Sequence, residues 1–189
     1  MNDAVASYTV KSRPDYHEVA PDQTAQCHVF ITDSAGLAQS EALCQASPVA
    51  KKQAWHIGDS DTLPAGYEAI QSGDWQAVLG EQLSGFGIAT AFYVSGLEAF
   101  LWQVHGVLTK AGFAPSQIHL EPPAGNQRDV FCTHCYHITP DVSTTPARCA
   151  GCGRLLLVRD HFSRLHCAYV GVQINAEDPA EVPPTEELS

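Results

Sequence analysis

Short apolar runs alternate with longer amphipathic stretches over residues 26–122, a pattern typical of α/β domains that are built on a parallel sheet. The apolar runs predict five strands, over residues 28–31, 54–57, 67–70, 88–94 and 118–120. Apolar positions at three- and four-residue steps predict three helices, over residues 33–44, 74–83 and 97–111. A strand, a helix and a second strand at this spacing form a right-handed crossover between parallel strands. We therefore expect a three-layer α/β fold.

Two local signals mark the ends of the helix predicted over residues 97–111. Ser95-Gly96-Leu97-Glu98 has the spacing of a capping box, in which the serine and the glutamate each accept a hydrogen bond from a backbone amide. Gly112 follows the last apolar position, and a glycine there favours a left-handed residue that ends the helix.

The segments that flank the α/β region differ from it in composition. Residues 1–25 are polar and contain prolines, which predicts an extended arm with one edge strand around Tyr8–Val10. Two adjacent prolines in the segment 122–125 prevent a helix and predict a stiff boundary. Beyond it, apolar runs predict strands at 155–158 and 168–172, with a polar turn between them at 159–164. Residues 175–189 are rich in proline and glutamate, which predicts a flexible acidic tail.

Residues 126–174 contain two CxxC motifs, one formed by Cys132 and Cys135 and the other by Cys149 and Cys152. A CxxC turn brings two thiolates within reach of one ion, and two such turns complete a tetrahedral sulfur site. The spacing predicts that the four cysteines bind one metal ion in a small zinc-ribbon-like β module. The softness of sulfur and the tetrahedral geometry favour a structural zinc, with a rubredoxin-like iron as the alternative.

Charge is distributed unevenly along the chain, whose formal net charge is −11. Residues 1–125 have 13 acidic and 5 basic side chains, whereas residues 126–172 have 3 acidic side chains and 5 arginines. The acidic total argues against nucleic acid as a partner. The arginines either form a solvated basic surface or dock the cysteine region onto an acidic protein, because guanidinium groups pair well with carboxylates. The residues that we predict for this docking are Arg154, Arg159, Asp160, His161 and Arg164.

The sequence also bears on the cellular location of the protein. It contains no apolar run of about 18 residues, so we expect no transmembrane helix. Its first residues lack the basic and apolar regions of a signal peptide. Its seven cysteines show no disulfide framework, which fits a reducing compartment. We therefore expect a cytoplasmic protein with no membrane partner.

Residues 92–100 and 112–121 resemble the end of the NAD(P)-binding domain of ferredoxin reductases, where a strand leads through a Cys-Gly-Pro-type turn into a helix and a closing strand. Ser95 stands at the position of that family's reactive-site cysteine. Residues 32–36 contain one glycine and one acid, where dinucleotide binders have a glycine-rich loop for phosphate. The resemblance implies a truncated, degenerate ferredoxin-reductase-like fold over residues 26–122, in which we expect no catalytic and no cofactor-binding residues.

The C-terminal region resembles the small DmmA-type subunits of dimethylamine monooxygenase. The similarity lies in residues 149–155, in the Arg-Asp-His-Phe-Ser-Arg block at 159–164 and in residues 168–172, and it extends to Lys-Ser-Arg-Pro at 11–14. It implies an accessory, non-catalytic subunit of a complex that demethylates dimethylamine to methylamine and formaldehyde with O₂ and NADPH. It also implies that haem belongs to a catalytic subunit, and that FMN and a [2Fe–2S] cluster belong to an NADPH-dependent reductase subunit.

Two other functions are open on the residues alone. With iron in the sulfur site, the chain would carry electrons between the flavin and iron–sulfur reductase and the oxygenase. With a working nucleotide site, it would be a stand-alone NAD(P)-dependent reductase. A colourless zinc protein argues against the first function, and weak NADPH binding argues against the second.

Overall fold

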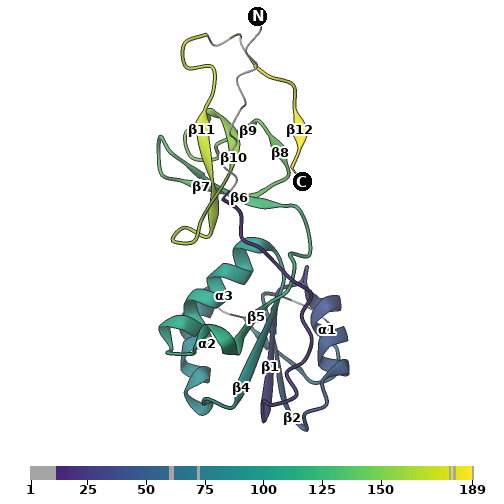
Figure 1. The fold of residues 1–189 in the computed structure, drawn as a ribbon. Helices are drawn as coiled ribbons and strands as arrows, with labels where there is room; N and C mark the ends of the chain where they lie inside the picture. Colours follow the sequence, from purple (N-terminus) through teal and green to yellow (C-terminus); the bar gives the residue numbers. More distant parts are fainter. Residues whose placement is uncertain (1–11, 60–61, 72, 179, 181, 189) are drawn as a thin grey trace, which may run out of the picture. The chain divides into compact units, whose positions relative to one another are not determined.

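The fold of the chain is known from a computed structural model that describes residues 12–59, 62–71, 73–178, 180 and 182–188 (Figure 1). The chain divides into two compact units. Tyr16–Arg128 form the first, which we call the α/β unit. Residues 12–15 join Asp129–Leu188 in the second, which we call the cysteine module. From residue 12 onward, the segment predicted as an extended arm is therefore divided between the two units, and the predicted edge strand at Tyr8–Val10 lies outside the described residues.

The α/β unit contains a five-stranded parallel sheet with the strand order β3-β2-β1-β4-β5. Its strands are β1 (Cys27–Thr32), β2 (Lys51–Ile57), β3 (Tyr67–Ile70), β4 (Thr90–Ser95) and β5 (Ile118–Leu120). Every residue of β1 and β4 is buried, as is usual for central strands that are covered on both faces. The structure confirms the mixed α/β class and the parallel sheet. The fourth strand begins two residues later than predicted, because Ile88 and Ala89 lie in a turn in which the amide of Thr90 donates to the carbonyl of Gly87 at 3.0 Å. The side chain of Ile88 is 94% exposed.

Helices cover both faces of this sheet (Figure 1). The helical segments are α1 (Leu37–Ala46), α2 (Trp75–Gln82), η1 (Leu83–Gly85), α3 (Glu98–Lys110) and η2 (Pro115–Gln117). On one face, Leu43 of α1 packs in a core with Phe30 and Tyr93. On the other face, apolar side chains of α2 and α3 share a core with Val29 and Ile31. Because neighbouring side chains of a strand point in opposite directions, the two cores make three layers.

The structure confirms the predicted end of α3 and corrects its beginning. Gly112 follows the helix with a φ of 95°, the left-handed conformation that glycine adopts readily. Ser95, however, belongs to β4 and donates its hydroxyl to Glu121. Glu98 accepts a hydrogen bond of 2.8 Å from the hydroxyl of Tyr16. The predicted capping box is therefore wrong, because both of its side chains have partners elsewhere in the fold.

The cysteine module contains a second five-stranded sheet, with the order β7-β6-β11-β10-β9, and a two-stranded sheet of β8 and β12. Its strands are β6 (Arg128–Cys132), β7 (Ile138–Val142), β8 (Thr144–Thr145), β9 (Ala147–Arg148), β10 (Leu155–Ser163), β11 (Ala168–Gln173) and β12 (Glu186–Glu187). The sequence pattern predicted only β10 and β11. Strands β6 to β9 are short and rich in polar residues, so they lack the apolar runs on which such a prediction depends.

One prediction for this module is wrong, and the last segment of the chain contains a strand that the sequence pattern did not predict. The segment predicted as a polar turn continues β10 as far as Ser163, with a bulge between Val158 and Phe162, and the connecting turn is residues 164–167. The segment predicted as a flexible tail contains β12, which pairs with β8. Leu188 follows β12 and is buried, so an apolar anchor holds the end of this acidic segment.

Candidate metal centre

Four cysteine sulfur atoms meet in the cysteine module, and all lie within 4.8 Å of one another. The Sγ atoms of Cys132 and Cys152 are 3.9 Å apart, and those of Cys135 and Cys149 are 3.6 Å apart. Sulfur atoms that bind one zinc tetrahedrally, at about 2.3 Å each, are about 3.8 Å from one another. The structure therefore brings the four predicted ligands together at the spacing that such an ion needs.

The two CxxC turns have the same backbone hydrogen bonds. The amide of Cys132 donates to the carbonyl of His137 and its carbonyl accepts from Tyr136, both at 2.9 Å. In the second turn, the amide of Cys149 donates to the carbonyl of Arg154, and the carbonyl of Cys149 accepts from the amide of Gly153, both at 2.9 Å. The residue after each second cysteine has a positive φ, 64° at Tyr136 and 72° at Gly153. The two halves of the cluster are thus copies of one CxxC turn.

Backbone amides favour ionised sulfur in the second turn. Burial opposes the ionisation of Cys149, but two amides of its own turn, together with the sulfurs of Cys135 and Cys152, lower its pKa to about 6. The amide of Arg154 lowers the pKa of Cys152. In the first turn, the amide of His137 favours the thiolate of Cys135, but burial and the neighbouring sulfurs raise the pKa of that thiol to about 12. Four thiolates at this distance need a cation between them, and soft sulfur donors suit zinc or iron.

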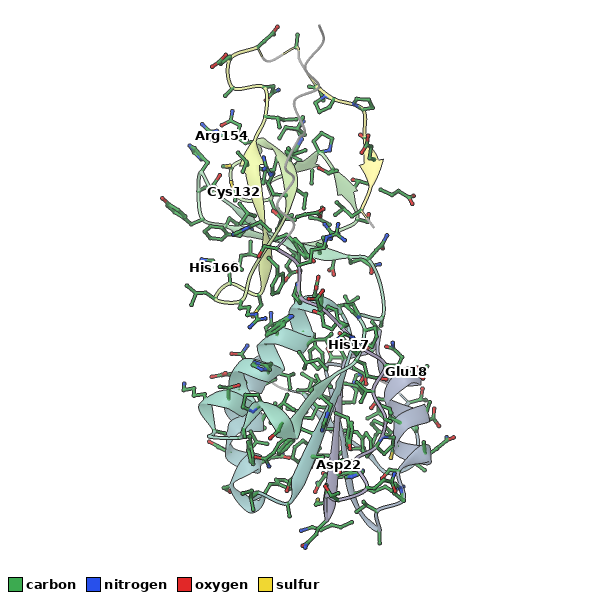
Figure 2. The ribbon with its side chains drawn as sticks, in the orientation of Figure 1. His17, Glu18, Asp22, Cys132, Arg154 and His166 are labelled. Atoms are coloured by element: carbon green, nitrogen blue, oxygen red, sulfur yellow. The ribbon has the colours of Figure 1, made fainter. Side chains whose placement is uncertain are left out.

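Side chains around the sulfur atoms brace both turns. Arg154 and Cys132 both belong to the cysteine module (Figure 2). Arg154 donates from Nε to Oε1 of Gln173 at 2.8 Å, and its Nη1 lies 3.1 Å from Nδ1 of His134. It therefore connects the second turn to β11 and to the first turn. Gly151 provides space for His137, because a Cβ at Gly151 would lie 2.6 Å from Cβ of that histidine. Of the predicted docking residues, Arg154 is thus the one that contacts a CxxC turn directly.

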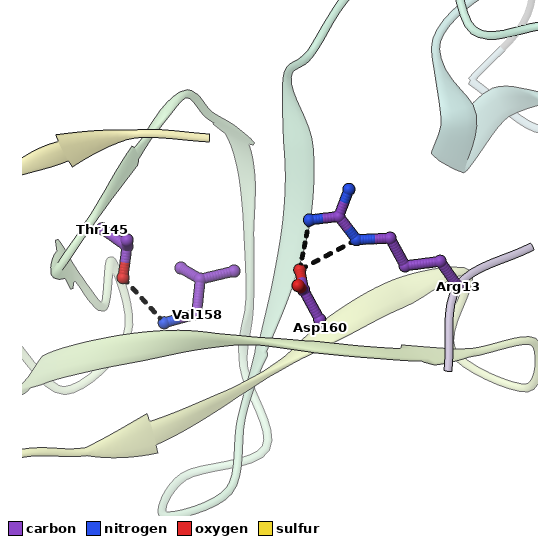
Figure 3. Close-up of polar contacts among 4 residues, drawn as sticks. All are labelled: Arg13, Thr145, Val158 and Asp160. Carbon is purple, nitrogen blue, oxygen red and sulfur yellow. Dashed lines mark hydrogen bonds and ion pairs between the residues drawn. The ribbon is translucent and has the colours of Figure 1, made fainter. Parts of the chain in front are cut away.

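The other predicted docking residues do not share one turn. Arg159, Asp160 and His161 lie in β10, and Arg164 begins the turn that follows it. The carboxylate of Asp160 pairs with the guanidinium of Arg13 and accepts its Nε–H at 2.9 Å (Figure 3). Arg159, His161 and Arg164 are exposed. The predicted set therefore divides into residues that brace the module and residues on its surface.

Two segments distant in sequence attach to β10. The amide of Ser12 donates to the carbonyl of Asp160 at 2.8 Å, and its carbonyl accepts from the amide of Phe162 at 2.9 Å. The hydroxyl of Thr145 accepts from the amide of Val158 at 3.0 Å (Figure 3). A bulge interrupts the regular ladder between Val158 and Phe162 and leaves backbone groups for such partners. The sequence analysis did not predict these contacts. Its one indication that residues 11–14 matter was their resemblance to the DmmA-type subunits.

The carboxyl edge of the α/β sheet, where the strand order reverses between β1 and β4, is the usual ligand position of such folds. Asp33 fills it, because its carboxylate accepts from the amides of Gly36 at 2.8 Å and Leu97 at 3.0 Å. A Cβ on Gly36 would lie 2.2 Å from the carbonyl carbon of Ser95, so the loops after β1 and β4 are in direct contact. Nearby, burial raises the pKa of Glu121. Groups of the chain itself thus bind the amides that a phosphate would use.

The fold and the sulfur cluster define a two-unit protein, in which a parallel α/β unit accompanies a candidate four-cysteine metal centre. Family models of dimethylamine monooxygenase subunit DmmA-like proteins match the chain twice, the N-terminal domain at residues 8–118 and the C-terminal domain at residues 129–172. The chain is 30% identical over 168 residues to the heme-dependent oxidative N-demethylase delta subunit of Ectopseudomonas mendocina (strain ymp), across 89% of this chain and 91% of that protein. The chain belongs to the dimethylamine monooxygenase subunit DmmA-like family.

Among solved structures, the siderophore-interacting protein SipS from Aeromonas hydrophila is similar to 54% of this chain, with a TM-score of 0.37 and 16% sequence identity. The match spans about half of that protein, 51% of its chain. Within the described ranges, every helix is too short or too polar to cross a membrane.

Proposed function

We propose that this chain is an accessory, non-catalytic subunit of a cytoplasmic, haem-dependent dimethylamine monooxygenase. The complex converts dimethylamine, O₂, NADPH and a proton to methylamine, formaldehyde, water and NADP⁺. Haem belongs to the catalytic subunit, and FMN and a [2Fe–2S] cluster belong to the reductase subunit. The present chain holds a structural zinc and organises these partners. The observation that carries the proposal is its 30% identity, over 89% of its length, to a heme-dependent oxidative N-demethylase delta subunit.

The geometry of the sulfur site supports a structural role. Cysteines supply all four positions of a tetrahedral ion, and catalytic zinc sites instead keep one position open for water or substrate. Cys132 and Cys149 are buried, which limits access to the ion further. Zinc does not change its oxidation state, so the module would contribute stability rather than electron transfer.

The α/β unit supports the same reading. At its carboxyl edge the carboxylate of Asp33 takes the amides of Gly36 and Leu97, and a negative charge there repels phosphate. A degenerate ferredoxin-reductase-like unit of this kind serves as a scaffold, while NADPH binds to a partner subunit.

Metal analysis of the chain, purified under reducing conditions, tests the sulfur site. We expect a colourless protein with stoichiometric zinc, and loss of zinc in Cys149→Ser. Cys167→Ser is the matched control, because Cys167 lies in the same module outside the four-sulfur cluster. A red protein with visible absorption would identify iron and favour the electron carrier. A metal-free wild-type protein would refute the centre altogether.

Reconstitution with the other subunits of the complex tests the accessory role. Dimethylamine-dependent NADPH oxidation and formaldehyde release are measured with and without this chain. We expect full activity only when the chain is present, and weak NADPH binding by the chain alone. Tight NADPH binding by the isolated chain would favour the stand-alone reductase and would contradict the closed phosphate position.

A further inference from the structure

The sheet of the cysteine module has an apolar face that is partly accessible. Along a strand, side chains alternate between the two faces of a sheet. One face of β6, β11 and β10 presents Phe131, Val170, Val172 and Leu157, and these residues are neighbours in register, Val170 with Phe131 and Val172 with Leu157. Val172 is 40% exposed, and the other three are half-buried. We call these four residues the outer face.

Exposed groups enlarge the outer face. The ring of His166 stacks on Phe131, with centroids 4.2 Å apart and an interplanar angle of 5°. The ring of Tyr136 approaches Phe131 at 5.9 Å, and this tyrosine is 73% exposed. Leu165, next to His166 in the turn between β10 and β11, is 87% exposed. Large apolar side chains gathered on one surface are typical of a protein contact.

Positive charge borders this apolar surface. Arg164 lies in the same exposed turn as Leu165, and Arg159 is exposed on the strand that contains Leu157. Asp160 lies between them in the sequence, and its carboxylate is paired with Arg13 within the module. A complementary surface would therefore combine apolar side chains with carboxylates.

We propose that the outer face, with Tyr136, Leu165 and the bordering arginines, binds an acidic and partly apolar surface on another subunit of the N-demethylase complex. The inference rests on the proposed function and adds the surface through which the chain joins the complex. A second copy of this chain fits less well. A two-fold contact between outer faces would bring like charges together, and contact with another region of a second copy would be heterologous, which gives a ring or an open filament rather than a dimer.

Variants of exposed residues test this surface without disturbing the core. The affinity of each variant for the purified complex that lacks this chain is measured by biolayer interferometry at low and high salt. We expect Leu165→Ser to bind at least about tenfold more weakly, as for a central interface residue. We expect Arg164→Glu to bind more weakly and with less dependence on salt. Ile88→Ser is the matched control, because Ile88 is 94% exposed in the α/β unit and should leave the affinity unchanged.

Hydrogen exchange of the wild-type chain, alone and in the assembled complex, provides a readout that needs no variant. We expect protection of residues 155–172 on assembly. Unchanged affinity of both variants, absence of this protection, or a stable homodimer of the purified chain that protects the same residues would each overturn the inference. If the wild-type chain does not join the complex at all, the proposed function fails instead, so the two failures are distinguishable.

Discussion

Replacement of Gly36 by alanine should destabilise the α/β unit strongly. Gly36 has a φ of −89°, which any residue can adopt, so the backbone conformation does not require a glycine at this position. A Cβ at this position would lie 2.2 Å from the carbonyl carbon of Ser95 and 2.3 Å from the amide nitrogen of Gly96. Both are backbone atoms, which cannot rotate away as a side chain can. The loops after β1 and β4 would have to separate.

The magnitude follows from the size of this overlap. Carbon atoms normally stay about 3.5 Å apart, so the loops must move by more than about 1 Å. That movement would also stretch the 3.0 Å hydrogen bond between the amide of Leu97 and the carboxylate of Asp33. Overpacking typically costs about 1–3 kcal/mol, and a weakened bond to a charged group places this variant at the upper end. A loss of about 3 kcal/mol lowers the Tm of a unit of this size by about 10–20 °C.

Tryptophan fluorescence during urea unfolding follows this unit alone, because Trp55, Trp75 and Trp102 all lie in it. The matched control is Gly106→Ala. Gly106 is exposed in the middle of α3, and no atom lies within 4 Å of a Cβ placed there. The control should become more stable by up to about 1 kcal/mol, from helix propensity. If Gly36→Ala and Gly106→Ala unfold at the same urea concentration, the argument from direct loop contact is refuted.

Three further changes test other contacts. Arg13→Ala removes the partner of Asp160 and should lower the stability of the cysteine module by about 1 kcal/mol in thermal unfolding, since the pair is only partly buried; an unchanged melt would contradict that pairing. Tyr136→Gly relieves a left-handed residue and should raise the stability of the module by up to about 1 kcal/mol, and a lower stability would mean that the lost ring contact outweighs the backbone term. Glu121→Gln tests the effect of burial, which raises the pKa of this carboxyl in the folded state above its unfolded value. The wild-type stabilisation is then complete below the unfolded pKa and falls as the pH rises through the folded pKa, whereas the variant should lack this decrease. Urea titrations from about pH 4 to about pH 8 measure the difference, and parallel profiles for the two proteins would count against the raised pKa.

The central strands could be predicted because they consist of consecutive, mostly apolar residues. β1 and β4 are covered on both faces, so no polar alternation interrupts the pattern. The same rule placed Ile88 in β4, although its side chain is 94% exposed. Hydrophobicity indicates that a side chain favours burial, but it does not state whether another element covers that position.

The sulfur cluster was predictable for a different reason. A CxxC turn is local, so its spacing alone brings two thiols together. The contact between Arg13 and Asp160 joins residues 147 positions apart, and no local pattern records it. Ser95 and Glu98 are the opposite case. Their spacing suits a capping box, but the fold brings Glu121 and Tyr16 near them, and they form hydrogen bonds with these residues instead.

The sequence by itself determined the α/β class, the parallel sheet and the two CxxC pairs, because each depends on residues that are near one another in the chain. Only the tertiary structure decided that Asp33 occupies the carboxyl edge of the sheet, that Arg13 pairs with β10 and that Phe131, Val170, Val172 and Leu157 share one face. Those outcomes depend on which strands become neighbours and in which register, a choice made by the packing of the whole unit rather than by any segment of it.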